Sequence, residues 1–496
     1  MNSFGKIRSV FWPVHRFELK RVLPLLFMYS LIAFCYGVLR NCKDSMVVTA
    51  SGAEAIAFIK VWAILPSALL LTLLFTRLSS RYTKEKVFYI MMGIFLSFFF
   101  VFTFVLYPAQ EVLHPHRFAD SLQGALPQGL KGLVSVFRNW TFTLFYVMSE
   151  LWGTAILSVL FWGFANEVTK VSEAKRFYVI WTIGANVAGI FAGQFAVFLS
   201  KSIYLPWIRY GANAWDQSVL FVNTLVIIAG IGTLFLFRYV AKMTPEREEI
   251  AKKATKIKMS MKENFSYLLK SRYLLYIAAI VLAYNLSINL IEIVWKNQMR
   301  ELYPSPSEYN GCMGSVMTWM SILATVISIV ATFGNVLKRF SWTSVALVTP
   351  LIALAAGSLF FLFVLSGQLG YAGSFLGMTP LALSVMLGSV HNGMTRACKH
   401  TLFDATKEMS FIPLDSESKL KGKAAIDGVG SRLGKSGGSV IHQGLLLLLG
   451  SVGASAPYVA AIFLGVVVIW VISLKALGRQ FDALSSKKEE ASPVDA

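Results

Sequence analysis

The chain has 496 residues, of which 56% are hydrophobic and 14% aromatic, and its mean hydropathy is +0.61. This composition excludes a soluble globular protein and indicates one that crosses a membrane many times. The net charge of +20 would suit nucleic-acid binding. However, most Lys and Arg residues fall on one side of the apolar segments, which is the positive-inside pattern, so we expect no nucleic-acid partner.

The apolar segments predict an all-α integral membrane protein with twelve transmembrane helices. They cover residues 24–41, 54–76, 87–107, 139–165, 177–199, 217–240, 273–295, 313–337, 343–365, 377–395, 430–452 and 455–477. An even number of spans places both termini on one side, which the basic loops identify as the cytoplasm. Residues 1–23, the predicted cytoplasmic N-terminal tail, have the features of neither a signal peptide nor a typical transit peptide.

The spans fall into two predicted six-helix bundles, residues 24–240 and 273–477. A basic cytoplasmic linker with nine Lys and Arg residues, 241–272, joins them, and a cytoplasmic tail, 478–496, follows. Lys43-Asp44 after the first span matches Lys296-Asn297 after the seventh at an offset of 253 residues. Such matches favour a parallel duplication. It corresponds to a major-facilitator-like 6+6 arrangement with a pseudo-two-fold axis and a substrate site between the halves.

Charged residues inside the apolar segments are the main functional signal. Lys60 interrupts the apolar run 55–75. A lysine at the centre of a span costs roughly 2.5–3.5 kcal/mol on insertion scales, so we expect it to face a polar cavity and an anion. The alternative is a lysine that snorkels or pairs with a neighbouring helix.

Further charged and polar residues come from both halves. Several cations around one cavity suit a polyanionic solute, and amide or imidazole groups suit a heterocycle. Glu150 and Glu292 would repel a phosphate, so they suit gating, cation pairing or proton coupling; structural ion pairs are the alternative. The candidate phosphate-binding residues are Lys60, Lys435, Arg40, Lys43, Lys296 and Arg432, and the candidate base-binding residues are Asn186, Asn392, His391 and Asn289.

The sequence contains no recognisable catalytic or metal motif. Gly434-Lys435-Ser436 invites a Walker A interpretation, but that motif needs four residues between its first glycine and Gly-Lys-Ser. Gly430 leaves three and Gly428 leaves five. The four cysteines have no metal-ligand spacing. We therefore expect no enzyme, cofactor or metal; a membrane-embedded transferase is the alternative, and it would need a catalytic cluster at an interface.

Nine segments together carry a family resemblance. They are residues 43–44 with 47–50, 52–56, 58–62, 113–115, 150–153, 161–167, 173–178, 403–409 and 434–438. In them the chain resembles the non-mitochondrial ATP/ADP carriers of plastids and obligate intracellular bacteria. The resemblance implies nucleotide transport by alternating access, most simply ATP/ADP antiport, with functional roles for Lys60, Glu150, Glu292 and Lys435. We expect a bacterial member, located in the inner membrane and acting as a monomer.

The sequence departs from the pattern of many ATP/ADP exchangers at three places. These are Phe34-Cys35-Tyr36, Arg40-Asn41 and His391-Asn392. Proton-coupled import of other nucleoside triphosphates is therefore an alternative, with Glu150, Glu292 and His391 as candidate proton carriers. The expected partners are the lipid bilayer, ATP, ADP and related nucleotides, with phosphate or protons as possible co-substrates.

Overall fold

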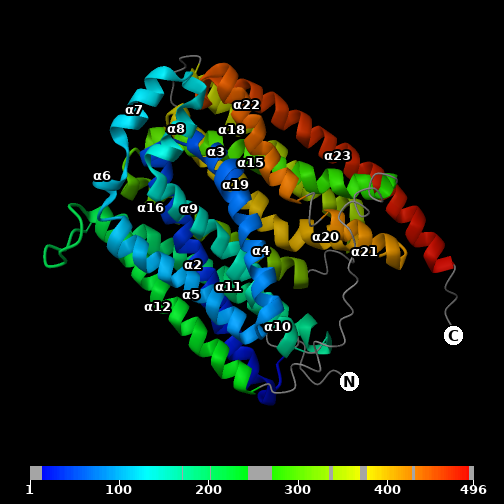
Figure 1. Ribbon diagram of the computed structural model, residues 1–496. Coiled ribbons are helices and arrows are strands. Elements are labelled where there is room, and N and C mark those ends of the chain that lie inside the picture. Colours follow the sequence, from blue (N-terminus) through cyan, green and yellow to red (C-terminus); the bar gives the residue numbers. More distant parts are fainter. Residues whose placement is uncertain are drawn as a thin grey trace. The chain divides into compact units, whose positions relative to one another are not determined.

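The computed structural model describes residues 14–169, 171–201, 203–243, 271–333, 339–368, 377–426 and 431–490. Every regular element in these ranges is helical (Figure 1). The first six predicted spans correspond to α2 (Leu19–Ser51), α3–η2–α4 (Glu54–Phe58, Ile59–Ile64, Leu65–Arg81), α5–η3 (Lys84–Val101, Phe102–Leu106), α9–η5–α10 (Trp140–Trp152, Gly153–Phe161, Trp162–Val168), α11 (Val171–Leu199) and α12 (Ala214–Met243).

The remaining predicted spans are also helical. They correspond to α15 (Arg272–Leu302), α16 (Pro306–Phe333), α18 (Trp342–Gln368), α19 (Pro380–Cys398), α22 (Ser431–Leu449) and α23 (Val452–Glu490). Shorter helices connect them: η1 (Arg16–Glu18), α6 (Gln110–Leu113), α7 (His116–Ala125), η4 (Gln128–Leu130), α8 (Lys131–Arg138), η6 (Lys399–Phe403), α20 (Asp404–Ser410) and α21 (Ser416–Ala425).

Ten helical stretches in the described ranges are long and apolar enough to cross a membrane. The two other predicted spans coincide with α19 and α22. Polar residues such as His391 and Asn392 lower the mean hydropathy of α19. In α22, the apolar stretch Ser436–Leu449 is too short to be counted among the ten. The predicted all-α membrane fold is therefore confirmed, and the two spans outside the ten both carry candidate site residues.

Some predicted helix ends are wrong. The first span was expected to end at residue 41, but α2 continues to Ser51; the seventh was expected to end at 295, but α15 continues to Leu302. Hydropathy falls at Lys43 and Lys296, yet both side chains are buried and paired inside the protein. The predicted loop between the third and fourth spans contains four short helices, from α6 to α8.

The chain divides into two compact units. The first contains the described residues of 1–126, 131–256 and 303–325, and the second contains those of 127–130, 257–302 and 326–496. In the first unit, α2 packs against α9, α11 and α12. A Cβ added at Gly193 of α11 would lie only 2.5 Å from the carbonyl oxygen of Gly314 in α16, so glycine permits this close helix crossing.

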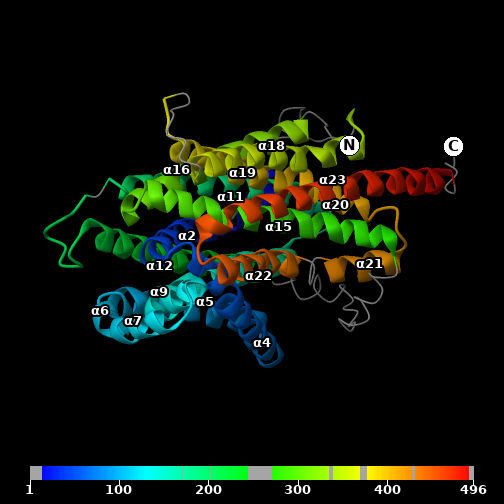
Figure 2. The ribbon, with the colours of Figure 1, turned by 90° about the horizontal axis from the view of Figure 1, so that it is seen from above.

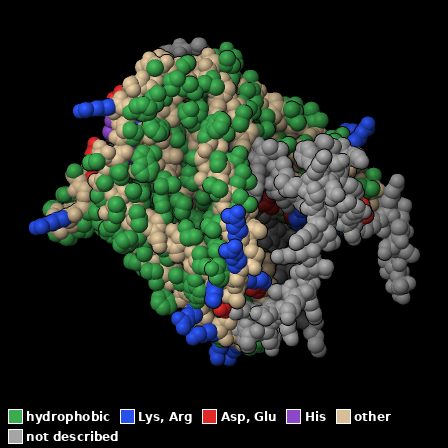
Figure 3. Space-filling view, in the orientation of Figure 1, with side chains coloured by type: hydrophobic (Ala, Val, Ile, Leu, Met, Phe, Trp, Pro, Cys, Tyr) green, Lys and Arg blue, Asp and Glu red, His purple; other side chains and the backbone are tan. Residues whose placement is uncertain are grey.

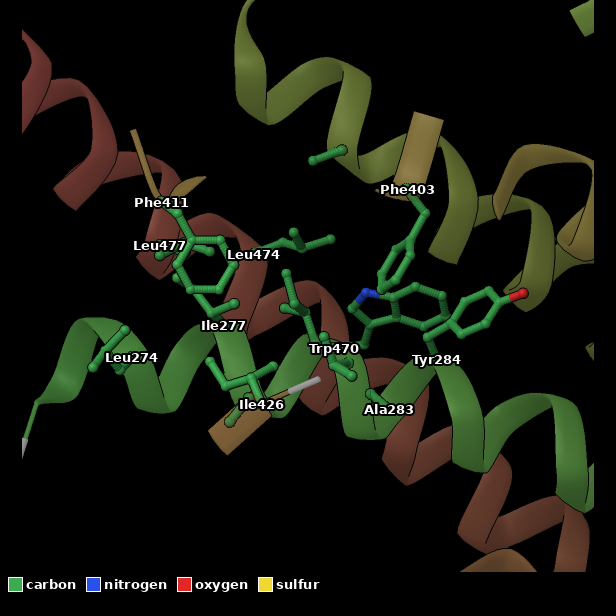
Figure 4. Packing of buried hydrophobic residues seen from close by; sticks show 14 of the residues in the cluster. Leu274, Ile277, Ala283, Tyr284, Phe403, Phe411, Ile426, Trp470, Leu474 and Leu477 are labelled. Atoms are coloured by element: carbon green, nitrogen blue, oxygen red, sulfur yellow. The ribbon is translucent and has the colours of Figure 1, made fainter. Parts of the chain in front are cut away.

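In the second unit, α15 packs against α19, α22 and α23, and α18 packs against α19 and α23. Figures 1 and 2 both show α15 and α23 side by side. A buried cluster of aromatic and aliphatic side chains joins these helices (Figure 4). Tyr284 stacks on Phe403 with ring centroids 4.6 Å apart, and Trp470 meets Tyr284 edge-on at 5.8 Å. This packing holds α15, which carries Glu292 and Lys296, against α23.

Large apolar side chains are also exposed on the membrane-spanning helices. Hydrophobic side chains cover much of the described surface seen in Figure 3. They include Leu70 and Leu73 on α4, Phe100 on α5, and Phe235 on α12, all more than half exposed. Contiguous apolar surface of this kind is suited to lipid.

Candidate functional site

A cluster of charged side chains lies in the first unit, between α2 and α9. Lys43 is 3% exposed, and its Nζ lies 3.1 Å from Asp44 Oδ1 and 3.3 Å from Glu150 Oε2. The same Nζ lies 3.6 Å from the centroid of the Tyr146 ring. A buried ammonium group needs such partners, because desolvation strongly disfavours the isolated charge. Lys43 is therefore held in place by two carboxylates and one aromatic ring.

Arg40 and Lys60 add two more positive charges to this cluster. Both interact electrostatically with Glu150, and both side chains are half-buried. Glu150 lies within a predicted membrane span, yet its side chain is 38% exposed. The cluster therefore has an accessible side, formed by Glu150, Arg40 and Lys60, and a closed side, formed by Lys43 and Asp44.

Local backbone geometry sets the position of Lys60. It lies in η2, a π-helical stretch from Ile59 to Ile64 that is followed by Pro66 in the first turn of α4. Proline has no N–H to donate to the carbonyl four residues earlier, so an α-helix cannot continue unchanged through this point. π-helical turns of this kind are rare and occur frequently at functional sites.

A second charged cluster lies in the second unit, between α15 and α19. Lys296 is 1% exposed, and its Nζ lies 3.0 Å from Glu292 Oε1, one helical turn away. Arg396 of α19 approaches the same oxygen, with its Nη2 at 3.5 Å. The Glu292 carboxylate thus pairs with two cations. Glu292 is 10% exposed and Arg396 is 26% exposed, so the arginine forms the accessible side of this cluster.

Tryptophan hydrogen bonds fix the helix pairs that carry the two clusters. In the first unit, Trp152 Nε1 donates to the carbonyl of Ile32 at 3.2 Å and ties α9 to α2. In the second, Trp295 Nε1 donates to the carbonyl of Val385 at 3.1 Å and ties α15 to α19. Each unit therefore links the first and fourth of its predicted spans by a tryptophan and by a carboxylate–cation pair.

The candidate base-binding residues lie in different settings. Asn289 is buried and donates to the carbonyl of Asn285 at 2.8 Å, and Asn392 is buried and donates to Gly388 at 3.0 Å. His391 is fully buried and meets the Phe463 ring edge-on at 5.9 Å. Asn186 is half-buried on α11 in the first unit. Asn186 is therefore the most accessible of the four.

Helix α22 approaches α15 through two glycines. A Cβ at Gly434 or at Gly438 would lie 2.7 Å from the Cβ of Asn285 or Asn289, respectively. Glycine at these positions therefore brings the α22 backbone directly onto the polar face of α15. The side chains of Arg432 and Lys435, which belong to this helix, lie outside the described residues.

Sequence reasoning missed Arg396. The predicted tenth span ended at residue 395, so Arg396 counted as a loop residue, whereas α19 continues to Cys398. The signal was its spacing of four residues from Asn392, which places both on one helix face. Asp44 belongs to the sequence repeat and to the resemblance segments, but adjacency alone does not predict its pairing with Lys43.

Both clusters carry an excess of positive charge. The first contains three cations and two carboxylates, and the second contains two cations and one carboxylate. An accessible cation next to a carboxylate that another lysine already neutralises can bind an anion without leaving a bare negative charge. Among the described residues, no group of side chains has the composition of a metal site.

Solved transporters share this fold. A bacterial homologue of the iron transporter ferroportin aligns with a TM-score of 0.54 at 13% identity, covering 94% of this chain and all of that one. A D-xylose–proton symporter aligns with a TM-score of 0.54 at 12% identity, covering 92% of this chain and 97% of that one. These likenesses define the fold as an α-helical membrane fold of the major-facilitator-like class.

The chain belongs to the TLC ATP/ADP transporter family, whose pattern matches residues 1–481. It is 44% identical to ADP,ATP carrier protein 1 of Chlamydia pneumoniae, over 98% of this chain and 96% of that one. It is 40% identical to the chloroplastic ADP,ATP carrier protein 2 of Arabidopsis thaliana, over 95% and 76%. It is 36% identical to ADP,ATP carrier protein 1 of Rickettsia bellii, over 99% of each chain. The family resemblance read from the sequence is therefore confirmed.

Proposed function

We propose that this protein exchanges ATP for ADP across a membrane by alternating access. The relatives at 36–44% identity over nearly the whole chain bear the name ADP,ATP carrier. The structural observation that carries the proposal is the cluster of Arg40, Lys43, Lys60 and Glu150 in the first unit. It places excess positive charge, partly accessible, on helices that span the membrane, where charged side chains are costly and indicate function.

The phosphate groups are the proposed ligands of the accessible cations. Lys60 and Arg40 are half-buried and sit beside Glu150, so they can contact an anion directly. Lys43 and Lys296 are almost fully buried, and their contribution is to neutralise Glu150 and Glu292 from behind. Lys435 and Arg432 are the proposed phosphate-binding residues on α22. Binding thus uses charge–charge contacts, which are stronger than neutral hydrogen bonds.

Amide and imidazole groups are the proposed readers of the base. Asn186 is positioned to act directly because it is half-buried. Asn289, His391 and Asn392 are buried, so a nucleotide reaches them only in a conformation that exposes α15 and α19 more fully. Alternating access supplies such changes in exposure.

Glu150 and Glu292 are the proposed gating residues. Each carboxylate interacts with more than one cation: Glu292 contacts Lys296 and Arg396, and Glu150 contacts Lys43 and is attracted by further cations. One interaction can therefore be released while another keeps the charge paired. This lowers the cost of moving a buried ion pair, because an uncompensated buried charge is the expensive state.

The setting of the exchange is also proposed. The protein acts as a monomer in the inner membrane of a bacterium, with both termini in the cytoplasm and two six-helix bundles joined by the basic linker. Exchange of ATP with about four negative charges for ADP with about three moves one net charge. This costs roughly 2.3 kcal/mol per 100 mV when the extra charge enters a negative interior. Counter-movement of phosphate would offset that term.

The test is uptake of labelled ATP by bacterial cells that express the full chain. Exchange predicts uptake that survives a protonophore and expels preloaded ADP. Lys60→Ala should abolish uptake, whereas the matched control Lys201→Ala, on an exposed loop lysine, should not. Uptake that collapses with the proton gradient, or that prefers another nucleotide, would refute the exchange and support proton-coupled import. No nucleotide flux in a protein shown to be inserted would refute both.

A further inference from the structure

A short segment of α19 concentrates buried polar atoms that have no hydrogen-bond partner among the residues that the structure describes. They are both ring nitrogens of His391, Oδ1 of Asn392, Oγ1 of Thr395 and Nε of Arg396. Most buried polar atoms in proteins are hydrogen-bonded, so five such atoms within six residues require an explanation. Arg396 stands out among these residues because its side chain is 26% exposed, whereas the other three residues are at most 3% exposed.

The guanidinium group of Arg396 is only weakly engaged. A guanidinium has five N–H donors. In the described part of the chain, its one ion-pair partner is Glu292, at 3.5 Å from Nη2. Charge-assisted N–H···O hydrogen bonds are normally about 2.7–2.9 Å long. Arg396 is therefore a permanently charged donor, partly accessible, with most of its hydrogen-bonding capacity unused.

Glu292 does not depend on Arg396 for neutralisation. Lys296 Nζ lies closer to the same carboxylate oxygen, at 3.0 Å, and is 1% exposed. If Arg396 turns toward an incoming anion, Glu292 keeps the charge of Lys296 as its partner. The cost of releasing the arginine is then lower than for an isolated buried pair, in which the carboxylate would be left alone.

From this geometry we infer that Arg396 is an anion-binding residue that contacts a phosphate group of the transported nucleotide. The planar fork of a guanidinium matches two phosphate oxygens at once, which a lysine ammonium group cannot do. Glu292 orients the arginine before the ligand binds, and Lys296 remains the partner of the Glu292 carboxylate afterwards. This inference rests on the proposed function, because it takes a nucleotide as the ligand.

Equilibrium binding to the purified full-length protein in lipid nanodiscs tests the inference. The probes are labelled ATP, ADP and adenosine. We expect Arg396→Gln to weaken the binding of ATP and ADP about 10-fold or more, which is the usual effect of losing a charge-assisted contact. Adenosine has no phosphate, so its affinity should change less than about two-fold. Arg396→Lys keeps the charge but not the fork, so it should give an intermediate ATP affinity.

Two further variants separate ligand contact from a structural role. Arg479→Gln removes an exposed arginine of α23 in the same unit and should leave ATP affinity unchanged. The double variant Glu292→Gln/Arg396→Gln removes the carboxylate together with the arginine, so Glu292 no longer needs a cation to neutralise it. If Arg396 only neutralised Glu292, this variant would recover ATP affinity; if Arg396 binds phosphate, ATP affinity stays low.

Several results would overturn the inference. They are unchanged ATP binding in Arg396→Gln, equal losses for adenosine and ATP, or recovery in the double variant. If Arg396→Gln does not fold, full wild-type affinity in Arg396→Lys would refute the fork contact. Failure of the proposed function looks different. If the exchange alone fails, the wild-type protein still binds ATP, and the failure appears in the uptake assay; if nucleotide transport fails altogether, the wild-type protein itself binds neither ATP nor ADP.

Discussion

Removal of the Lys43 charge tests whether the first cluster is built as the structure indicates. Lys43→Met keeps an unbranched side chain, one atom shorter, but removes the ammonium group that lies 3.1 Å from Asp44, which is 1% exposed. At an effective dielectric constant of 20, Lys43 attracts each of the two carboxylates by about 5 kcal/mol. Burial of the ammonium group offsets much of this attraction, and the Glu150 share is screened because that side chain is 38% exposed.

The remaining cost falls mainly on Asp44. Breaking a buried ion pair by removing one partner typically costs about 3–5 kcal/mol, so we expect a loss near the lower end, about 3 kcal/mol. With about 2–4 °C per kcal/mol for a folding unit of 150–250 residues, the melting temperature should fall by roughly 6–12 °C. Thermal unfolding of the purified protein in detergent, followed by intrinsic fluorescence, measures this change.

The double variant Lys43→Met/Asp44→Asn is the matched control. It removes both charges together, so no buried carboxylate loses its nearest partner. Replacing a whole buried pair by neutral groups is often close to neutral for stability, so the melting temperature should recover most of the loss. A Lys43→Met protein that melts within 2 °C of the wild type would show that Asp44 is not held as a buried anion by Lys43, and the reasoning for this cluster would fail.

Three further variants test other parts of the structure. Lys60→Ala should lower ATP uptake about 10-fold or more, because Lys60 is a half-buried charge next to Glu150. The amount of inserted protein should equal that of the control Lys201→Ala. Normal uptake would show that Lys60 does not bind phosphate. Gly438→Val should destabilise the protein by about 1–3 kcal/mol in thermal unfolding, because its Cβ would lie 2.7 Å from the Asn289 Cβ; an unchanged melting temperature would contradict this helix contact. Burial lowers the pKa of His114 below 6.5, so the unfolded chain binds a proton at a higher pH than the folded protein does. Stability should therefore fall as the pH drops below 6.5, and His114→Gln should reduce that dependence in melting curves recorded between pH 5 and 7.5; an equal pH dependence in both proteins would refute it.

The membrane fold and the first charged cluster could be predicted from the sequence more completely than the second cluster. Lys60 and Glu150 were readable because each is a single charge in a long apolar segment. Arg396 was not, because hydropathy averages over a window and the polar residues before it ended the predicted span. The short helices between residues 108 and 138 were missed for a related reason, since each is too short to produce a hydropathy signal.

Backbone details around the site were also beyond sequence reasoning. The π-helical stretch η2 contains Lys60 and η5 begins shortly after Glu150, but patterns with a period of 3.6 residues assume an α-helix throughout. Pro66 indicated a disturbance in the second span without specifying its geometry. The residues Arg40, Lys43 and Lys60 were grouped by charge alone, and only the structure separates the buried Lys43 from its half-buried neighbours.

Each unit pairs a buried lysine with a carboxylate, but the two units place the carboxylate on different helices. Lys43 and Lys296 occupy matching positions in the sequence repeat and are the most buried cations of their clusters. The carboxylate, however, lies on the fourth span in the first unit, as Glu150, and on the first span of the second unit, as Glu292, where Arg396 supplies the contact to the fourth. When the carboxylate and the cation exchange helices, their attraction is preserved, but the two halves of the chain no longer carry the same residue at these positions. A buried ion pair adds little net stability. We therefore propose that its role in both units is functional, because a carboxylate that interacts with two cations can release one of them to a phosphate.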